Sequence, residues 1–340
     1  MRRITGLVAP LFLLIGLLAA GPAGAATTAS YVVVLDQAVA DPGAAAAQLT
    51  RAHGGEVGFV YRHAVKGFSL RASAAAAAAL ARSPLVAYVE ADQVYSVDAQ
   101  SVPTGVQRIF ADDNGEIDID GSDDFRVDVD VAVIDTGIDL DHPDLNVVAS
   151  TNCSGGGPFK RSCGSGGNDG HGHGTHVAGT IGAIDNDQGV VGVAPGARLW
   201  AVKVLSDSGS GYTSWILAGL DYVVANADAI EVGNMSLGGS FSQALNDGVA
   251  GAVDAGVTMV VAAGNSDADA ADFSPASEPK AITVSALADF NGEPGGGANP
   301  TCRSDQDDTL ADFSNWGSVI DIAAPGVCIN STWLNGGYNV

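Results

Sequence analysis

Basic residues are scarce in this sequence. Of its 340 residues only 15 are Lys or Arg, against 39 Asp or Glu, and the formal net charge is −24. The imbalance lies almost wholly after residue 98, where eight Lys and Arg face 33 Asp and Glu. A surface with this many carboxylates attracts cations and repels phosphates. We therefore expect no nucleic-acid partner. Adaptation to a salty or alkaline medium would explain the same charge without a specific ligand.

Long apolar runs are missing after the N-terminus. The one run, from Leu7 to Ala20, follows Met1-Arg2-Arg3, precedes Ala23-Gly24-Ala25 and is short for a membrane span. A basic start, a short apolar segment and a small-residue cleavage site are typical of an export signal. We therefore expect residues 1–26 to direct secretion to the extracellular space. A membrane anchor is the alternative, but no second apolar segment supports it.

Cysteine is rare, and no two cysteines form a C-x-x-C pair, which argues against a cysteine metal site. Export makes disulfides permissible, although free thiols remain an alternative. Four cysteines allow three pairings. We favour the pairing of sequence neighbours, because each pair brackets a Gly-rich or Asp-rich loop with few apolar residues to hold it. The predicted disulfides are Cys153–Cys163 and Cys302–Cys328.

Residues 27–98 read as a small α+β domain that precedes the acidic segment. Apolar alternation indicates strands, alanine-rich stretches indicate helices, and Ser73 is a helix cap. The order βαββαβ is typical of a ferredoxin-like sandwich. The elements are expected at residues 31–35, 42–53, 56–61, 67–71, 73–81 and 86–90.

From residue 99 onward, strands alternate with helices. This alternation predicts an α/β domain with a parallel sheet and helices on both of its faces. In such sheets ligands bind at the carboxyl ends of the strands. Strands are expected at 127–134, 199–204, 228–235, 257–262 and 281–285, and helices at 174–184, 214–226 and 241–254.

Two polar residues at predicted element ends suggest acid–base chemistry. Asp135 directly follows a buried strand, where a carboxylate costs free energy unless it has a partner. A turn-capping aspartate is the plain alternative. His173 stands among glycines at a helix start, where a neutral imidazole can take up and return a proton. Zinc binding by His171, His173 and His176 is disfavoured by the glycine spacing and the absence of H-E-x-x-H, so His171 and His176 are interpreted as structural.

Three further segments could build a peptide-binding cleft. Asn265 follows a strand and could point its amide at a developing oxyanion, a contribution of about 3 kcal/mol, although a turn-forming role is the alternative. Residues 236–238 end another strand with small side chains, which leaves backbone groups free to pair with an extended peptide. Residues 208–212 could form the opposite edge of the cleft.

The order Asp135, His173, Asn265 on an α/β sheet resembles the subtilisin family of serine peptidases, nearest its proteinase K and subtilisin branches. The resemblance covers nearly all of residues 99–340 and includes Ile134–Asp139, His173–Gly179, Ser236–Gly239 and Ala263–Asn265. It implies that Asp135 orients His173, that His173 is the general base, and that Asn265 is the oxyanion donor. It implies substrate contacts at Ser210, Gly211, Ser236, Leu237, Gly238, Ala263 and Gly264.

The resemblance also implies how the chain is processed. Residues 27–98 resemble the inhibitory propeptide of the family, which also assists folding, and Ala99-Gln100-Ser101 matches the start of the mature enzyme. The peptidase domain would then span residues 99–340. The small residues that wall the first subsite favour apolar or aromatic substrate side chains. We thus expect a secreted serine endopeptidase precursor that acts on peptides and proteins and is inhibited by its own propeptide.

One family motif is absent. Gly-Thr-Ser-Met-Ala, which carries the nucleophilic serine, does not occur in residues 1–340. We expect it to follow Val340, so that the 340-residue chain is inactive by itself. One alternative is a catalytically dead relative that holds peptides by strand addition. Another is a stand-alone inhibitor role for residues 27–98.

Calcium is the cofactor that the resemblance implies. The first site would use side chains of Gln100, Asp144 and Asn186 and carbonyls of Ile184, Gln188 and Val190, which are oxygen ligands of the kind Ca²⁺ prefers. An ordinary polar turn is the alternative. A second site would use the carbonyls of Pro279 and Ala281 with Asp321. The carboxylate-rich stretch 112–130 is interpreted as a solvated insertion.

Overall fold

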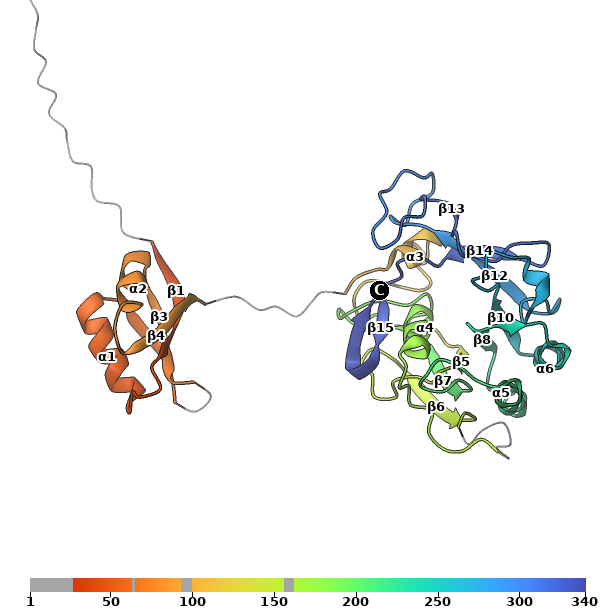
Figure 1. Cartoon of the computed structure of the whole chain (residues 1–340), viewed down its shortest axis with the longest axis horizontal. Coiled ribbons are helices and arrows are strands. Elements are labelled where there is room, and N and C mark those ends of the chain that lie inside the picture. The colour runs from red at the N-terminus through yellow and green to blue at the C-terminus, as the bar shows by residue number, and fades with distance from the viewer. Residues whose placement is uncertain (1–26, 63–64, 93–99, 156–161) are drawn as a thin grey trace, which may run out of the picture. The chain divides into compact units, whose positions relative to one another are not determined.

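The structure is a computed structural model that describes residues 27–62, 65–92, 100–155 and 162–340 (Figure 1). Contacts divide the chain into two compact units, Met1–Ser96 and Val97–Val340, which are described separately. The predicted export signal, residues 1–26, and the predicted junction at Asp98 and Ala99 lie outside the described residues. No helix in the described part of the chain is long and apolar enough to cross a membrane.

The N-terminal unit is a four-stranded antiparallel sheet with two helices. Its strand order, β2-β3-β1-β4, is that of the predicted ferredoxin-like sandwich. The core contains Val33, Leu35, Leu49, Phe68 and Leu80, all buried. The elements are β1 (Thr28–Leu35), α1 (Pro42–His53), β2 (Glu56–Tyr61), β3 (Gly67–Ser73), α2 (Ala74–Leu80) and β4 (Val86–Ala91).

The C-terminal unit is built on an eight-stranded sheet. The order is β13-β12-β10-β8-β5-β7-β6, with β14 beside β12, and every pairing is parallel except that of β13 with β12. The predicted parallel sheet is confirmed. Its strands are β5 (Asp130–Asp135), β6 (Val147–Asn152), β7 (Arg198–Lys203), β8 (Val232–Met235), β10 (Thr258–Ala262), β12 (Ile282–Ala288), β13 (Thr309–Leu310) and β14 (Ile322–Pro325).

Helices cover both faces of this sheet (Figure 1). Successive residues of a strand point to opposite faces, so in β5 Val131 and Val133 pack with α4 while Ala132 and Ile134 pack with α5 and α6. All six residues of β5 are buried, as expected for a central parallel strand. The helices are α3 (Thr104–Arg108), α4 (His173–Gly182), α5 (Thr213–Ala225) and α6 (Gln243–Asp254).

Two predicted strands are shorter in the structure. The strand expected at 127–134 begins only at Asp130, because Val127 N donates to Pro195 O rather than to a neighbouring strand. The strand expected at 228–235 begins at Val232, because the chain just before it makes turn hydrogen bonds to Asn226 O. The polar or short elements escaped prediction: α3, β6, β13, β14, the pair β9 (Gly239–Ser240) with β11 (Phe273–Ser274), and the hairpin β15 (Ser331–Trp333) with β16 (Gly337–Asn339).

Both predicted disulfides are present. Cys153 is bonded to Cys163, and Cys302 to Cys328, which leaves no free cysteine in the described residues. The first bond joins the end of β6 to the loop before α4. The second joins the segment between β12 and β13 to the segment between β14 and β15.

Candidate active site

Asp135 is the last residue of β5 and is completely buried. Its Oδ1 accepts a hydrogen bond from Thr136 N at 2.7 Å and contacts His173 Nδ1 at 2.7 Å. Its Oδ2 is buried without a partner among the described residues. A buried carboxylate needs hydrogen bonds to remain charged, so the two bonds to Oδ1 must supply this stabilisation.

His173 is the first residue of α4, and its side chain is 45% exposed. The hydrogen bond to Asp135 raises the pKa of the imidazole, and this effect outweighs burial, which lowers it. Since Nδ1 faces the carboxylate, Nε2 is the nitrogen available to a substrate or a nucleophile. The predicted pairing of Asp135 with His173 is therefore present in the geometry.

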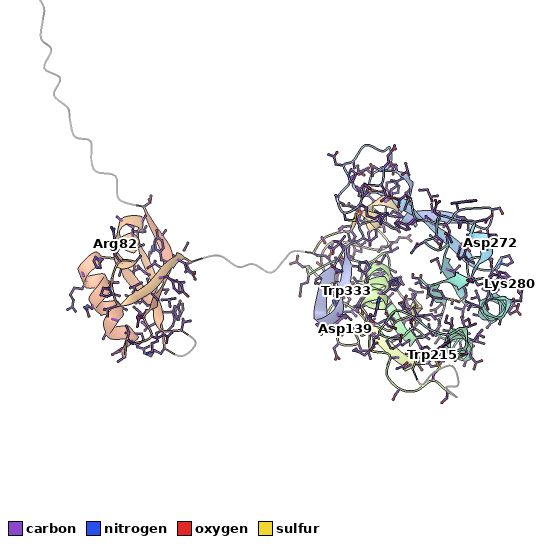
Figure 2. The ribbon with its side chains drawn as sticks, viewed as in Figure 1. Arg82, Asp139, Trp215, Asp272, Lys280 and Trp333 are labelled. Carbon is purple, nitrogen blue, oxygen red and sulfur yellow. A yellow bond between two sulfur atoms is a disulfide. The ribbon has the colours of Figure 1, made fainter. Side chains whose placement is uncertain are left out.

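Glycines hold His173 in this position. Gly174 packs so tightly that a Cβ there would lie 2.0 Å from Gly137 O, and its N–H donates to Thr136 Oγ1 at 2.9 Å. Gly172 has φ 105°, and a Cβ there would lie 2.4 Å from the ring of Trp333, which is labelled in Figure 2. No larger residue fits either position without moving the backbone.

Asp169 supports the turn before His173, and the sequence analysis missed it. Its Oδ1 accepts from the N–H groups of His171 and Gly172, and its Oδ2 accepts from the N–H and the hydroxyl of Thr175. Burial alone would raise the pKa of Asp169, but these hydrogen bonds hold it below its usual range. An aspartate just before a helix start is the sequence signal that could have identified it.

Lys203 is a second residue that the sequence analysis missed. It ends β7 opposite Asp135, and its side chain is almost fully buried. Its Nζ donates to Thr136 O and, at 2.7 Å, to Asp207 Oδ1. The ammonium therefore links the turn after Asp135 to the loop that follows β7. No local sequence pattern indicates this contact, because Lys203 and Thr136 are far apart in the chain and meet only in the folded sheet.

A cleft of about 430 Å³ opens beside His173. Two of the three predicted cleft segments face each other across it: Ser236, Leu237 and Gly238 on one side, and residues 208–211 on the other. Tyr212, also predicted at this edge, is instead the residue that precedes α5. The full lining is Thr136, His171, His173, Leu205, Ser208, Gly209, Ser210, Gly211, Ile216, Ser236, Leu237 and Gly238.

Asn265 lines an adjacent pocket of about 280 Å³, which shares the wall 236–238 with the cleft. Ala263 and Gly264 lie in the same pocket, together with the apolar side chains of Phe273 and Ala276. The Asn265 side chain is exposed and makes no hydrogen bond to another described residue. The pocket of Asn265 and the cleft of His173 therefore adjoin each other at residues 236–238.

The other two histidines of the glycine-rich motif have different positions. His176 points away from the cleft, and its Nε2 contacts Ile329 O at 3.0 Å and Asn339 O at 3.2 Å, in keeping with a structural role. His171 lines the cleft, although we had interpreted it as structural. No three His, Cys, Asp or Glu side chains converge into a metal site within the described ranges.

The residues predicted to bind the first calcium lie together. Gln100 Nε2 donates to Ile184 O at 2.8 Å and to Val190 O at 3.2 Å. Asn186 Nδ2 donates to Asp144 Oδ1 at 2.9 Å, and Gln188 N donates to Asn186 Oδ1. Burial raises the pKa of Asp144 to about 7, although hydrogen bonds from Asn186 and Tyr338 lower it. Asp144 is a buried carboxylate with no basic partner among the described residues, and the Gln100 and Asn186 amides now turn their nitrogens to it and to the Ile184 and Val190 carbonyls. With those two amides turned over, the same groups would offer a hard cation oxygen ligands.

The geometry at the second predicted calcium site gives less support. Asp321 is exposed, its Oδ2 accepts from Thr283 N at 2.8 Å, and its N–H donates to Thr283 O at 3.0 Å. One oxygen of the Asp321 carboxylate therefore already accepts a hydrogen bond beside the β12–β14 pairing.

The acidic stretch 112–130 is held partly by Asp185, whose carboxylate accepts hydrogen bonds from Asp120 N and Gly121 N.

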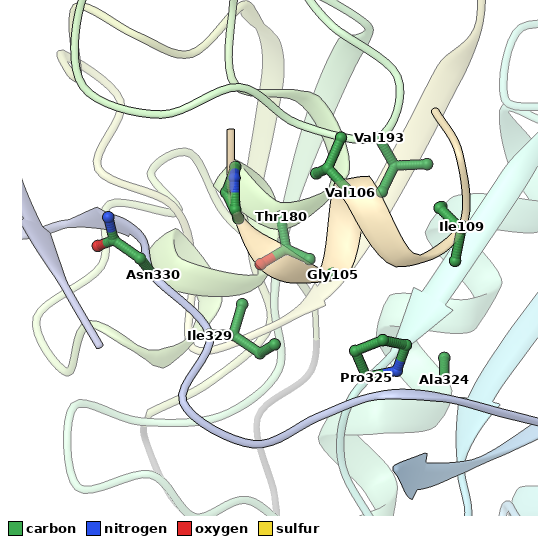
Figure 3. Close-up of a pocket in the computed structure, with 10 residues that line it drawn as sticks. Gly105, Val106, Ile109, Thr180, Val193, Ala324, Pro325, Ile329 and Asn330 are labelled. Atoms are coloured by element: carbon green, nitrogen blue, oxygen red, sulfur yellow. The ribbon is translucent and has the colours of Figure 1, made fainter. Parts of the chain in front are cut away.

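A separate apolar pocket of about 120 Å³ lies between α3, α4 and residues 324–330 (Figure 3). Its lining includes Val106, Ile109, Val193 and Ile329, and the polar side chains are those of Thr180 and Asn330. None of its lining residues is titratable, so this pocket offers no group for acid–base chemistry.

Comparison with known proteins agrees with this geometry. Residues 127–339 match the model of the subtilase family, and residues 30–98 match that of peptidase inhibitor I9. A crystal structure of a cold-adapted subtilisin-like serine proteinase superposes with a TM-score of 0.51 at 35% identity, covering 74% of this chain and 72% of that one.

Similar proteins include subtilisin E of Bacillus subtilis, 42% identical over 263 residues, which are 76% of this chain and 61% of that protein. The cuticle-degrading protease of Metarhizium anisopliae is 38% identical over 291 residues, which are 83% of this chain and 67% of that protein. The chain thus spans about 61% of the length of the subtilisins that it matches. With a family match over residues 127–339 and relatives at this identity, the chain belongs to the subtilase family.

Proposed function

We propose that the protein is the precursor of a secreted serine endopeptidase with His173 as its general base. The observation that carries the proposal is the 2.7 Å contact between His173 Nδ1 and buried Asp135, at the edge of a cleft that can hold an extended peptide. Asp135 fixes the tautomer and stabilises the imidazolium, so that Nε2 can accept a proton from a serine hydroxyl and return it to the leaving amine.

The nucleophile is the one member of the triad that the described residues do not provide. Within them, the His173 ring makes no hydrogen bond except that to Asp135, and Gly-Thr-Ser-Met-Ala is absent from residues 1–340. We propose a serine on that motif as the group that attacks the scissile carbonyl. Asn265 would donate its amide to the oxyanion that forms.

The cleft suggests how substrate is held. The backbone of residues 236–238 and of Ser210 and Gly211 can pair with an extended peptide by strand addition. The residue whose carbonyl is attacked, called the first residue below, would place its side chain in the pocket of Ala263, Gly264 and Asn265. Because Phe273, Ala276 and Leu237 line that pocket, it favours apolar or aromatic side chains.

We also propose that the chain is processed in two steps. Residues 1–26 would direct export, and residues 27–98 would inhibit the peptidase until cleavage near Ala99. The match of residues 30–98 to peptidase inhibitor I9 supports the inhibitory role.

Calcium is the proposed cofactor. It would be held by Gln100, Asp144 and Asn186 with the carbonyls of Ile184, Gln188 and Val190, and when bound it would neutralise the Asp144 carboxylate and join these segments. The convergence of these residues supports this site. The site at Pro279, Ala281 and Asp321 is proposed only on the family resemblance.

The test is hydrolysis of a peptide anilide with a large apolar first residue. The complete secreted protein should be active and residues 1–340 alone inactive. In the active protein, His173→Ala should abolish most turnover, and Asn265→Ala should lower kcat by roughly a hundredfold or more with little change in KM. His176→Ala should be mild by comparison. A complete protein that binds peptides without cleaving them would instead favour a catalytically dead binding protein.

A further inference from the structure

A second imidazole, that of His171, lines the cleft beside the proposed base. The His171 and His173 rings are 6.3 Å apart between centroids. His171 is exposed, but its backbone is held because its N–H donates to buried Asp169 Oδ1 at 2.8 Å. The ring is therefore presented to the cleft from a fixed turn.

One hydrogen bond defines which nitrogen of His171 faces a substrate. His173 N donates to His171 Nδ1 at 3.4 Å, so in the neutral ring Nδ1 is the acceptor and Nε2 carries the proton. Nε2 lies 2.8 Å from the position that a Cβ on Gly209 would occupy, so the ring lies against residues 208–211 of the cleft lining. Among the described residues Nε2 has no hydrogen-bond partner, and it is free to donate to a ligand.

The neighbouring polar groups are already engaged. Ser208 Oγ contacts Ser206 Oγ at 2.8 Å and Ser210 Oγ at 3.1 Å, so the rim hydroxyls bond to one another. The charged groups around the turn are also engaged: Lys203 pairs with Asp207, Asp169 accepts from the α4 N-terminus, and Asp135 pairs with His173. Of the two described histidines that line the cleft, His171 is the one whose Nε2 donates in the neutral ring, because neutral His173 carries its proton on Nδ1 toward Asp135.

The geometry of an extended peptide brings one substrate side chain toward His171. Successive side chains of a strand point to opposite faces. If the first residue occupies the pocket of Ala263 and Asn265, the residue before it, here the second residue, points toward the side of His171 and His173. Leu205 and Ile216 line the same cleft and can contact an aliphatic stem.

We propose that His171 determines specificity for the second residue of the substrate and selects glutamate or aspartate when its imidazole is protonated. This inference rests on the proposed peptidase function. The neutral ring donates one hydrogen bond to an acceptor such as Gln or Glu, whereas the protonated ring adds a charge-assisted bond to a carboxylate alone. Because the charge of a histidine side chain depends on pH, the preference depends on pH as well.

The experiment compares three peptide anilides that differ only at the second residue, which is Glu, Gln or Leu. The complete secreted protein is assayed from pH 5 to 9, with His171→Asn and His171→Lys as matched variants. The measured quantity is kcat/KM for the Glu peptide divided by kcat/KM for the Gln peptide. Protonation of His173 lowers both values by the same factor, so it does not change their ratio. The ratio should rise about fivefold or more on acidification in the native protein. It should stay near one with His171→Asn and be high at every pH with His171→Lys.

The outcomes separate the two proposals. Cleavage of all three peptides with a Glu/Gln ratio that does not change with pH would overturn the role of His171 and leave the peptidase function intact. A pH-dependent ratio that persists in His171→Asn would also overturn it. If the native protein cleaves none of the peptides, the peptidase function fails and the assignment of His171 fails with it.

Discussion

The imidazole of His173 makes its one ring hydrogen bond in the described structure with a carboxylate that solvent does not reach. That bond favours the protonated ring, so the pKa of His173 lies above the usual value of 6.5. The ring must be neutral to act as a base. The proposed peptidase activity should therefore be lost as the pH falls through the raised pKa, at a higher pH than for an isolated histidine.

Asp135→Asn should lower the pKa of His173, because the charged partner of the imidazolium is removed while the shape is kept. The measurement is an NMR titration of the His173 ring, which does not require a nucleophile and can be made on residues 1–340. Asp141→Asn is a matched control, since it removes the same charge from an exposed position near the same strand end. An unchanged His173 pKa in Asp135→Asn would contradict the assigned hydrogen bond.

At the scale of single elements, the start of α4 is the most constrained part of the site. Asp169 accepts four hydrogen bonds there, and Gly174 brings the helix against the turn after β5. This close approach allows a side chain on α4 to meet a carboxylate at the end of β5. The geometry of the Asp135–His173 pair therefore depends on the contact between β5 and α4.

Gly174→Ala should destabilise the protein by on the order of 3 kcal/mol, because its Cβ would meet Gly137 O at 2.0 Å and backbone atoms cannot turn away. Gly251→Ala, in α6, is the matched control, since a Cβ there has no heavy atom within 4 Å. It should stabilise by up to about 1 kcal/mol through helix propensity. Urea unfolding of both variants measures the difference, and equal effects would refute the packing argument.

At the scale of the whole molecule, the proposed calcium ligands come from segments far apart in the chain. Gln100 precedes the first helix of the domain, Asp144 follows β5, and residues 184–190 follow α4. Tyr338 of β16 reaches the same place and donates to Asp144 Oδ2 at 3.2 Å. A cation at this point would join these segments and stabilise the fold by mass action.

Chelation should therefore lower the Tm of the protein, and added calcium should restore it. Asp144→Asn should lose most of this response, because the carboxylate is the charged ligand of the set. Asp321→Asn is the control that separates the first site from the second. A Tm that does not change with chelator would refute the calcium proposal. If Asp321→Asn loses the response and Asp144→Asn keeps it, calcium binds at the second site and not at the first.

Local patterns in the sequence were sufficient for the fold class and for Asp135 and His173 as candidates, and the family resemblance paired the two residues. Apolar-rich runs indicated β5 and β10, alanine-rich stretches and the Ser73 cap indicated α1 and α2, and the glycine-rich motif identified His173. These features depend on neighbours in the chain, so a sequence pattern reveals them. The disulfides also followed from local spacing.

Only the tertiary structure decided which other residues belong to the site. Asp169, Lys203 and the cleft position of His171 depend on contacts between separate elements, such as that of Lys203 Nζ with Thr136 O. A buried charge or a free imidazole nitrogen is defined by what surrounds it in space. The sequence alone therefore determined the fold class and identified Asp135 and His173 as candidates, whereas packing determined the supporting network and the position of His171 in the cleft.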